Sequence, residues 1–424
     1  MNTARHRLAV RNGKVLLPSG KIEKADLLIA DGRIESVGQG GPAGAGRSAG
    51  KGRPAGTRGL GAKPAQAGAG GPAGAAAQAD AVVDASGCHV LPGLIDMHTH
   101  GIGLESTASE TLQEYAKQEA ARGATAFYPT FFGPPEQSAR ALERHRRATN
   151  ELRDLPQVRG FRLESPYLAR TGAGVSKDLR PITKEITDML LEAGAGLIRI
   201  WDVSPELPDA PGLVRRLAGA GILCSIAHTQ ASIEETRAVV DAGARLVTHM
   251  FDTFVLPPMT DTGVYPAGLV DYLLVEDRVA CEIIGDGTHV APLLVEKALR
   301  CKTPDRIAWI TDSNFGAGLA PGDYEAPDWG WIRVDGPNSG ARLRDRGMIL
   351  AGSALTPIDG FRNVVRLFGR DLETASRVCS RTPARLLGLR TGEIEPGYDA
   401  DLIIIDDALE LVATIAAGRI VYRR

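Results

Sequence analysis

The spacing of apolar residues changes at Leu94, and the change predicts two kinds of structure in one chain. Before Leu94, short apolar runs typical of strands alternate with turn-forming residues. Asp31-Gly32 stands between two of these runs and is a strong hairpin signal. The predicted strands cover residues 8–10, 14–17, 26–30, 33–37, 81–84 and 89–91.

Residues 39–79 interrupt this β-pattern. Nearly all of them are Gly, Ala, Pro or small polar residues, and their charged residues are all positive. Such a tract buries too little apolar surface to offset the entropy of ordering it, so we expect a disordered insertion. Dispersed cations without aromatic residues are weak support for a nucleic-acid tether.

From Leu94 onward, apolar strand-like runs alternate with segments of helical periodicity. The eight strand candidates are 94–101, 124–132, 158–165, 197–203, 222–229, 245–251, 280–286 and 307–313. Helix-like stretches between them are 109–122, 135–151, 182–193, 213–220, 233–242 and 292–301. Eight strands alternating with helices predict a closed (β/α)8 TIM-like barrel. An open doubly wound sheet would normally carry a glycine-rich phosphate turn after its first strand, and that turn is missing.

The C-terminal part is expected to complete the small β-structure. An irregular stretch (315–345) precedes helices near 358–368 and 372–388, and a β-rich tail follows. We expect this tail to pair with the N-terminal strands in a small β-sandwich domain formed from both chain ends. The predicted divisions are 1–91 and 389–424 for the small domain and 92–388 for the catalytic barrel.

Composition narrows the function classes. The net charge of −2 gives no reason to expect nucleic acid or a membrane surface as partner. The five cysteines are scattered without C-x-x-C spacing, which predicts neither a disulfide framework nor a cysteine metal site. Neither a signal-peptide core nor an apolar stretch near ~20 residues is found. We expect a cytoplasmic protein with a small-molecule substrate; a homodimer is considered as well.

Polar residues with metal-binding chemistry stand at the predicted strand ends. His98 and His100 lie two residues apart, so alternation along a strand places both on one face. Taken singly, each candidate could be a hydrogen-bonded residue at the barrel rim or a helix cap without a catalytic role. In such a barrel, however, the carboxyl ends of all strands lie at the same rim, so these residues would lie near one another. The further candidates are Glu164, His228, His249 and Asp312.

Chemistry suggests a role for each candidate. Glu164, His228 and His249 would form a three-ligand site with a position left for water. His98 and His100 would hold a second ion bridged by Glu164, or support the first. Asp312 is the acid/base candidate, accepting a proton from water and delivering it to a leaving nitrogen. These ligands suit a divalent metal such as zinc, and iron, manganese or cobalt are alternatives. The site would hold one or two ions.

Short segments spread along the chain match motifs of one known family. They are Leu91–Gly101, Leu163–Pro166, Ala227–Thr229, Thr248–Phe251, Asp286–His289, Thr311-Asp312, Leu350–Ser353 and Pro396–Leu402. On these segments, and over nearly everything except the insertion, the chain resembles the N-acetylglucosamine-6-phosphate deacetylases of the amidohydrolase superfamily. The resemblance implies metal-dependent deacetylation of an amino sugar, with His289 touching the substrate.

Several positions depart from that family's pattern, and most concern the substrate. Ser165 replaces a glycine, and Gly172-Ala173-Gly174 replaces a Gly-Ala-His whose histidine faces the substrate carbonyl. Asp252-Thr253 replaces an Asn-Ala that helps to hold the sugar phosphate, and Ser313-Asn314 follows Asp312 where an alanine is usual. By position, Asp252, Thr253 and Asn314 are predicted to face the substrate.

The arginine that contacts the sugar phosphate in that family is also missing, because residues 262–266 contain no arginine. Arg162, Arg170 or Lys177 could compensate for the acidic Asp252. Three functions therefore stay open: deacetylation of an amino sugar or its 6-phosphate, the same chemistry on another N-acyl or cyclic amide, and a non-catalytic barrel.

Overall fold

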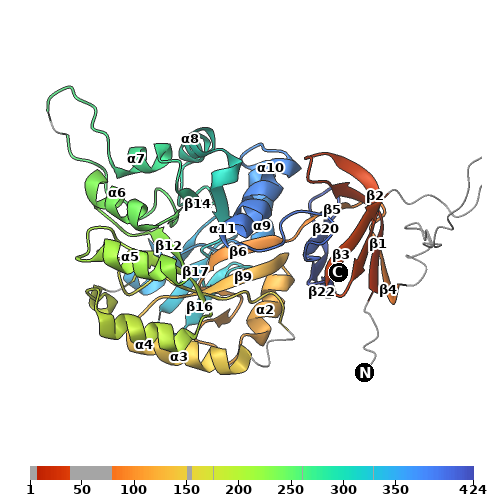
Figure 1. Ribbon diagram of the computed structural model, residues 1–424, viewed down its shortest axis with the longest axis horizontal. Helices are drawn as coiled ribbons and strands as arrows, with labels where there is room; N and C mark the ends of the chain where they lie inside the picture. Colours follow the sequence, from red (N-terminus) through yellow and green to blue (C-terminus); the bar gives the residue numbers. More distant parts are fainter. Residues whose placement is uncertain (1–6, 39–78, 150–154, 175, 260, 328) are drawn as a thin grey trace, which may run out of the picture.

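The computed structural model places the barrel and the small β-domain side by side (Figure 1). It describes residues 7–38, 79–149, 155–174, 176–259, 261–327 and 329–424. The insertion predicted to be disordered lies outside these residues, apart from its last position. Among the described residues, no helix combines the length and apolar character needed to cross a membrane.

Eight parallel strands form the barrel, in the order β15-β14-β13-β12-β11-β10-β9-β6. Each corresponds to one strand candidate, so the predicted (β/α)8 architecture is confirmed, with shorter strands than expected. Their bounds are β6 Leu94–Thr99, β9 Ala124–Phe131, β10 Phe161–Leu163, β11 Ile198–Val203, β12 Leu223–Ile226, β13 Leu246–Val247, β14 Ala280–Ile284 and β15 Ile307–Ile310.

The barrel closes between its first and last strands through backbone contacts at their carboxyl ends. Thr99 and Ser313 form a parallel bridge there. The His100 N–H donates to the Ser313 carbonyl at 2.8 Å, and the Asp312 N–H donates to the His98 carbonyl at 2.9 Å. The closure therefore brings the histidine pair of β6 beside the residues that follow β15.

Helices cover the outside of the barrel between the strands (Figure 1). Local capping explains some of their ends: at α6 the Ser232 side chain and Glu235 form a capping box. The helix α7 (Leu269–Val275) was not among the predicted helices. The others are α2 Gln113–Ala120, α3 Pro135–Thr149, α4 Lys184–Gly194, α5 Ala210–Gly219, α6 Ile233–Ala242, α8 Pro292–Lys302, α9 Pro357–Arg366, α10 Leu372–Ser376 and α11 Thr382–Leu386, with a π-helical turn Arg377–Arg381 between the last two.

Both chain ends build the small domain, as predicted. Its hydrogen-bonded order is β22-β21-β20-β5-β1-β2-β3, with β4 also paired to β1. Asp31 and Gly32 turn the β2–β3 hairpin with φ of 51° and 80°, the positive values that their residue types tolerate. The bounds are β1 Arg7–Leu16, β2 Ile22–Ala30, β3 Arg33–Gly38, β4 Ala81–Asp84, β5 His89–Pro92, β20 Leu402–Ile405, β21 Leu411–Ala416 and β22 Arg419–Arg423. The domain boundaries drawn from the sequence stay predictions.

The expectation of an irregular stretch at 315–345 is wrong. Antiparallel strands β16 (Gly322–Ala326), β17 (Gly330–Val334), β18 (Ala341–Leu343) and β19 (Ile349–Leu350) form a separate sheet there. They are two to five residues long, too short for a clear alternation in the sequence. Their stability comes from a buried cluster that no local pattern reveals: Phe315, Ala326, Ile332, Val334, Ala341, Leu343, Ala351 and Ala354.

Candidate metal centre and active site

The residues predicted at the strand ends meet at one end of the barrel. His98 and Glu164 lie at or just after β6 and β10, and His228, His249 and Asp312 follow β12, β13 and β15. The last three adopt φ of 47°, 25° and 48°. Non-glycine residues pay a steric cost in this left-handed region, and such strain is typical of functional sites.

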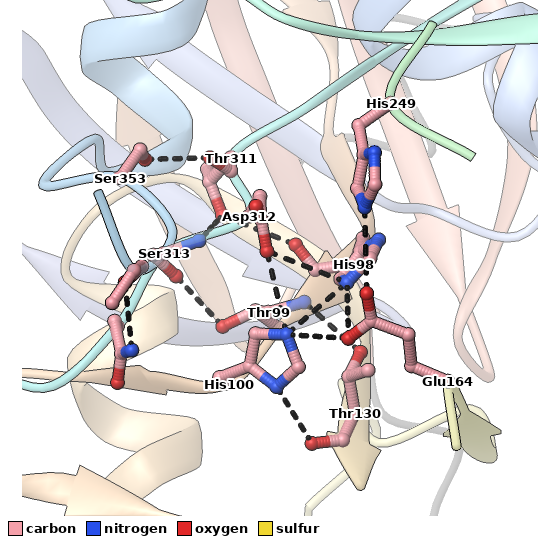
Figure 2. A network of polar contacts seen from close by, with 12 residues as sticks. His98, Thr99, His100, Thr130, Glu164, His249, Thr311, Asp312, Ser313 and Ser353 are labelled. Carbon is pink, nitrogen blue, oxygen red and sulfur yellow. Dashed lines mark hydrogen bonds and ion pairs between the residues drawn. The ribbon is translucent and has the colours of Figure 1, made fainter. Parts of the chain in front are cut away.

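Glu164 stands between two pairs of histidines, and each carboxylate oxygen faces one pair. Figure 2 shows its carboxylate between His249 and the pair His98 and His100. Its Oε2 lies 3.0 Å from Nε2 of His100 and 3.5 Å from Nε2 of His98. Its Oε1 lies 2.8 Å from Nε2 of His228 and 3.4 Å from Nε2 of His249. One carboxylate therefore joins two clusters of potential metal ligands.

The outward ring nitrogens of two of the histidines face fixed acceptors. Nδ1 of His100 lies 3.2 Å from the Thr130 carbonyl, and Nδ1 of His98 lies 3.6 Å from Glu282. His100 can donate its Nδ1–H to that carbonyl, as a ligand histidine usually does, which leaves its Nε2 lone pair for a metal, whereas Nδ1 of His98 is beyond hydrogen-bond distance of Glu282. The buried imidazole and carboxylate groups therefore fit two divalent ions.

Asp312 lies beside the histidine pair of β6. Its Oδ1 is 3.4 Å from Nε2 of both His98 and His100, and its side chain is buried (Figure 2). Its own carbonyl accepts from the Ser353 N–H at 2.7 Å, which fixes the turn. Burial raises the pKa of Asp312, but the facing His98 and His100 lower it to about 2. The carboxyl group is therefore ionised at neutral pH, as a proton acceptor must be.

Glu164 is also held in its charged form. Burial raises its pKa, but His98 and hydrogen bonds from the other histidines hold it well below the usual range. Conversely, burial lowers the pKa of His100, while hydrogen bonds to Asp312 and Glu164 raise it to about 10. The excess of negative charge at this point stabilises cations, whether protons or metal ions.

A cavity of about 80 Å³ opens onto the predicted metal ligands, and all four predicted substrate residues line it. Nδ1 of His289 lies 2.7 Å from Asp286, which orients the ring. The hydroxyl of Thr253 donates to the Asp252 carbonyl. The amide of Asn314 donates to the Ala351 carbonyl and accepts from the Phe315 N–H, so it fixes the loop as well. Their contact with a substrate stays a prediction.

An aromatic pair that the sequence analysis missed covers the site. The Phe132 ring lies 6.4 Å from the His100 ring and 6.5 Å from the His228 ring, measured between centroids. The Trp329 ring lies 6.0 Å from that of Phe132 and 6.4 Å from that of His100. Trp329 is in the β16–β17 turn, within the stretch expected to be irregular, so no pattern indicated it. Phe132 closes an apolar strand and looked like an ordinary core residue.

Arg162 does not compensate for Asp252, contrary to one expectation. It is fully buried in the barrel, where its guanidinium donates to both oxygens of Asp202 and to those of Glu282. Glu282 in turn faces His98. Arg162 therefore fixes Glu282, the carboxylate that faces the predicted ligand His98. The sequence contained a signal for this buried ion pair, because Arg162 and Glu282 are single charged residues inside the apolar runs Phe161–Leu163 and Cys281–Ile283.

Comparison with known proteins agrees with this geometry. A model of the Amidohydrolase family matches residues 89–421. An N-acetylglucosamine-6-phosphate deacetylase of Lysinibacillus sphaericus is 30% identical over 357 residues, covering 80% of this chain and 87% of the relative. An N-acetylgalactosamine-6-phosphate deacetylase of Escherichia coli O157:H7 is 28% identical, covering 76% of this chain and 84% of the relative.

A solved structure has a similar overall fold. It is a mutant N-acetyl-D-glucosamine-6-phosphate deacetylase of Mycobacterium smegmatis in complex with N-acetyl-D-glucosamine-6-phosphate. It is 27% identical, and the match covers 99% of this chain and 100% of that one with a TM-score of 0.78. The family match spans most of the sequence and includes every predicted metal ligand. The chain is therefore a member of the amidohydrolase family.

Proposed function

We propose that this amidohydrolase removes the N-acetyl group from an acetamido sugar phosphate, such as N-acetylglucosamine 6-phosphate, and releases acetate. The observation that carries the proposal is Glu164, whose two oxygens each face a histidine pair beside an ionised Asp312. The relatives support the substrate class, because both the N-acetylglucosamine and the N-acetylgalactosamine 6-phosphate deacetylases resemble this chain.

The metal proposal has two parts. Glu164, His228 and His249 would hold one divalent ion, and His98 and His100 would hold a second that shares Glu164. A divalent ion supplies Lewis acidity toward the amide carbonyl and lowers the pKa of water. We propose zinc on ligand chemistry, with iron, manganese or cobalt acceptable to the same donors.

Asp312 performs the proton transfers in this proposal. Its carboxylate accepts a proton from the attacking water and donates it to the amide nitrogen as the carbon–nitrogen bond breaks. The amine and acetate then leave. Phe132 and Trp329 limit access of bulk water to the reacting groups, since their rings contact His100 and each other.

Acetate release from N-acetylglucosamine 6-phosphate by the metal-replete protein tests the function. Asp312→Asn should retain the bound metal and lower kcat at least ~100-fold. A variant with unchanged kcat would remove Asp312 from the mechanism. Wild-type protein that binds no divalent metal would instead favour the non-catalytic barrel.

One observation keeps a second substrate class under consideration. Among the described residues that line the central cavity, none is a lysine or arginine, and Asp252 is partly exposed there. A neutral N-acyl compound or a cyclic amide would suit this cavity better than a phosphate located beside Asp252. Turnover of unphosphorylated substrates at rates above those of the 6-phosphates would support this alternative.

A further inference from the structure

A second cavity of about 260 Å³ adjoins the metal centre on the side of α3. It shares His100, Phe132, Asn314 and Trp329 with the central cavity, so the two spaces adjoin at these side chains. The central cavity of about 80 Å³ is small compared with the roughly 300–1,000 Å³ of ordinary ligand pockets. A substrate with its acyl group at the metal centre must therefore extend into an adjoining space.

The two cavities differ in charge. The central one is lined by the carboxylates Glu164, Asp252 and Asp312. The side cavity is lined by Arg140 and Arg144, and no Asp or Glu is among its lining residues in the described part of the chain. Of these two cavities, only the side cavity has lining charges that attract an anion.

The arginines are arranged to receive a ligand. They stand four residues apart on α3, so they lie on one face of the helix, one turn from each other. Arg144 is anchored by donating to the carbonyls of Thr107 and Ala108, while its Nε is buried without a hydrogen-bond partner among the described residues. Arg140 is exposed and forms no ion pair within the part of the chain that the structure describes, unlike Arg147 farther along the helix, which pairs with Glu143.

We propose that this side cavity binds the anionic group of the substrate, a phosphate or carboxylate, while the acyl group lies at the metal centre. The proposal rests on the proposed function, whose substrate it specifies further. Guanidinium groups recognise such oxyanions with paired, charge-assisted hydrogen bonds. An anion in the side cavity would also avoid Asp252, because that carboxylate lines the central cavity and not the side cavity.

A third cavity is a weaker candidate. It measures about 210 Å³ and carries Lys177 and Arg346, but the carboxylate of Asp178 also lines it. Arg346 donates to the Ala173 carbonyl. The mixture of charges reduces its attraction for an anion, so the α3 side is favoured.

Charge reversal on α3 tests the proposal. Arg140→Glu should raise KM for N-acetylglucosamine 6-phosphate on the order of tenfold, with little change in kcat. KM for unphosphorylated N-acetylglucosamine should stay within about twofold. Arg147→Glu is the matched control, with the same change of net charge on the same helix, and should leave both constants unchanged. An N-acetylhexosamine with a carboxyalkyl ether tests the carboxylate as the alternative anion.

A binding measurement separates this inference from the proposed function. Glucose 6-phosphate has no amide to hydrolyse, so its affinity for the metal-replete protein reports the anion site alone. Weaker binding to Arg140→Glu than to Arg147→Glu would support the site even if no acetate were released from any substrate. Equal effects of the two substitutions on both the phosphorylated and carboxylated ligands would overturn it, as would absence of wild-type binding to either.

Discussion

The ring of Phe132 occupies the space that a side chain at Gly174 would need. A Cβ built at residue 174 would overlap two ring carbons of Phe132. This contact gives a physical reason for one departure from the deacetylase pattern, in which a histidine is expected after Gly172-Ala173. Here the polar group is replaced by an aromatic wall that contacts His100 and His228.

The overlap predicts a coupled pair of positions. Gly174→Ala should lower the free energy of unfolding by about 1–3 kcal/mol, because the Phe132 ring must move. In a Phe132→Ala background, the same substitution should cost little, so a double-mutant cycle in urea should show coupling. Gly219→Ala is the control, since a Cβ there meets no atom within 4 Å. Additive effects at 132 and 174 would refute the overlap.

The position of Glu164 predicts an asymmetric loss of metal. His100→Asn should remove one ion and His228→Asn the other, because each histidine belongs to one cluster. Glu164→Gln should weaken both, since its two oxygens serve both clusters. Metal content per chain measured by elemental analysis checks this, with His89→Asn in the small domain as control. Loss of a single ion in Glu164→Gln would contradict shared ligation.

His145 predicts a pH dependence of stability. Burial lowers its pKa to about 4, although its hydrogen bond to the Thr107 carbonyl acts in the opposite direction. Between pH 6.5 and 4 the unfolded chain therefore binds more protons at this position than the folded chain does. The contribution of His145 to the free energy of unfolding is therefore fully present above pH 6.5. It falls as the pH drops to 4, by roughly 3 kcal/mol over the whole interval.

Replacement of His145 should flatten that dependence. In His145→Gln, the free energy of unfolding should decline less steeply from pH 6.5 to 4 than in wild type, as measured by urea titrations at several pH values. His89→Gln, at a half-buried histidine of the small domain, serves for comparison. Curves of equal slope for wild type and His145→Gln would show that the ring is protonated in the folded protein.

Arg162 predicts a large cost for breaking a buried charge cluster. Arg162→Met leaves Asp202 and Glu282 without their shared partner, and it should destabilise the fold by about 3–5 kcal/mol. Arg333→Met, at a partly exposed ion pair with Asp335, should cost less than about 1 kcal/mol. Similar decreases in the free energy of unfolding for the two variants would mean that the buried cluster stabilises the fold no more than a surface ion pair does.

The barrel, and the meeting of the candidate metal ligands at one of its ends, could be predicted because their signals are local. Candidate ligands stood at the ends of several apolar strands, and because the strands of a parallel barrel end at one rim, His98 and His249 could be expected to meet there. The antiparallel sheet after Phe315 could not be predicted in this way, since its strands are short and its core forms only in three dimensions. Trp329 was therefore not predicted as a site residue, and Arg162 was expected near Asp252 although it lies in the barrel interior.

The sheet shared by the two chain ends affects the order in which the protein can assemble. Strand β5 pairs on one edge with β20, through Leu402 and Pro92 among others. During synthesis, a nascent chain at 5–20 residues per second takes on the order of tens of seconds to extend from one partner to the other. For that time the edge of β5 has no strand to pair with, and an unpaired edge invites association with other chains. The small domain can therefore be completed only after all strands of the barrel have been synthesised.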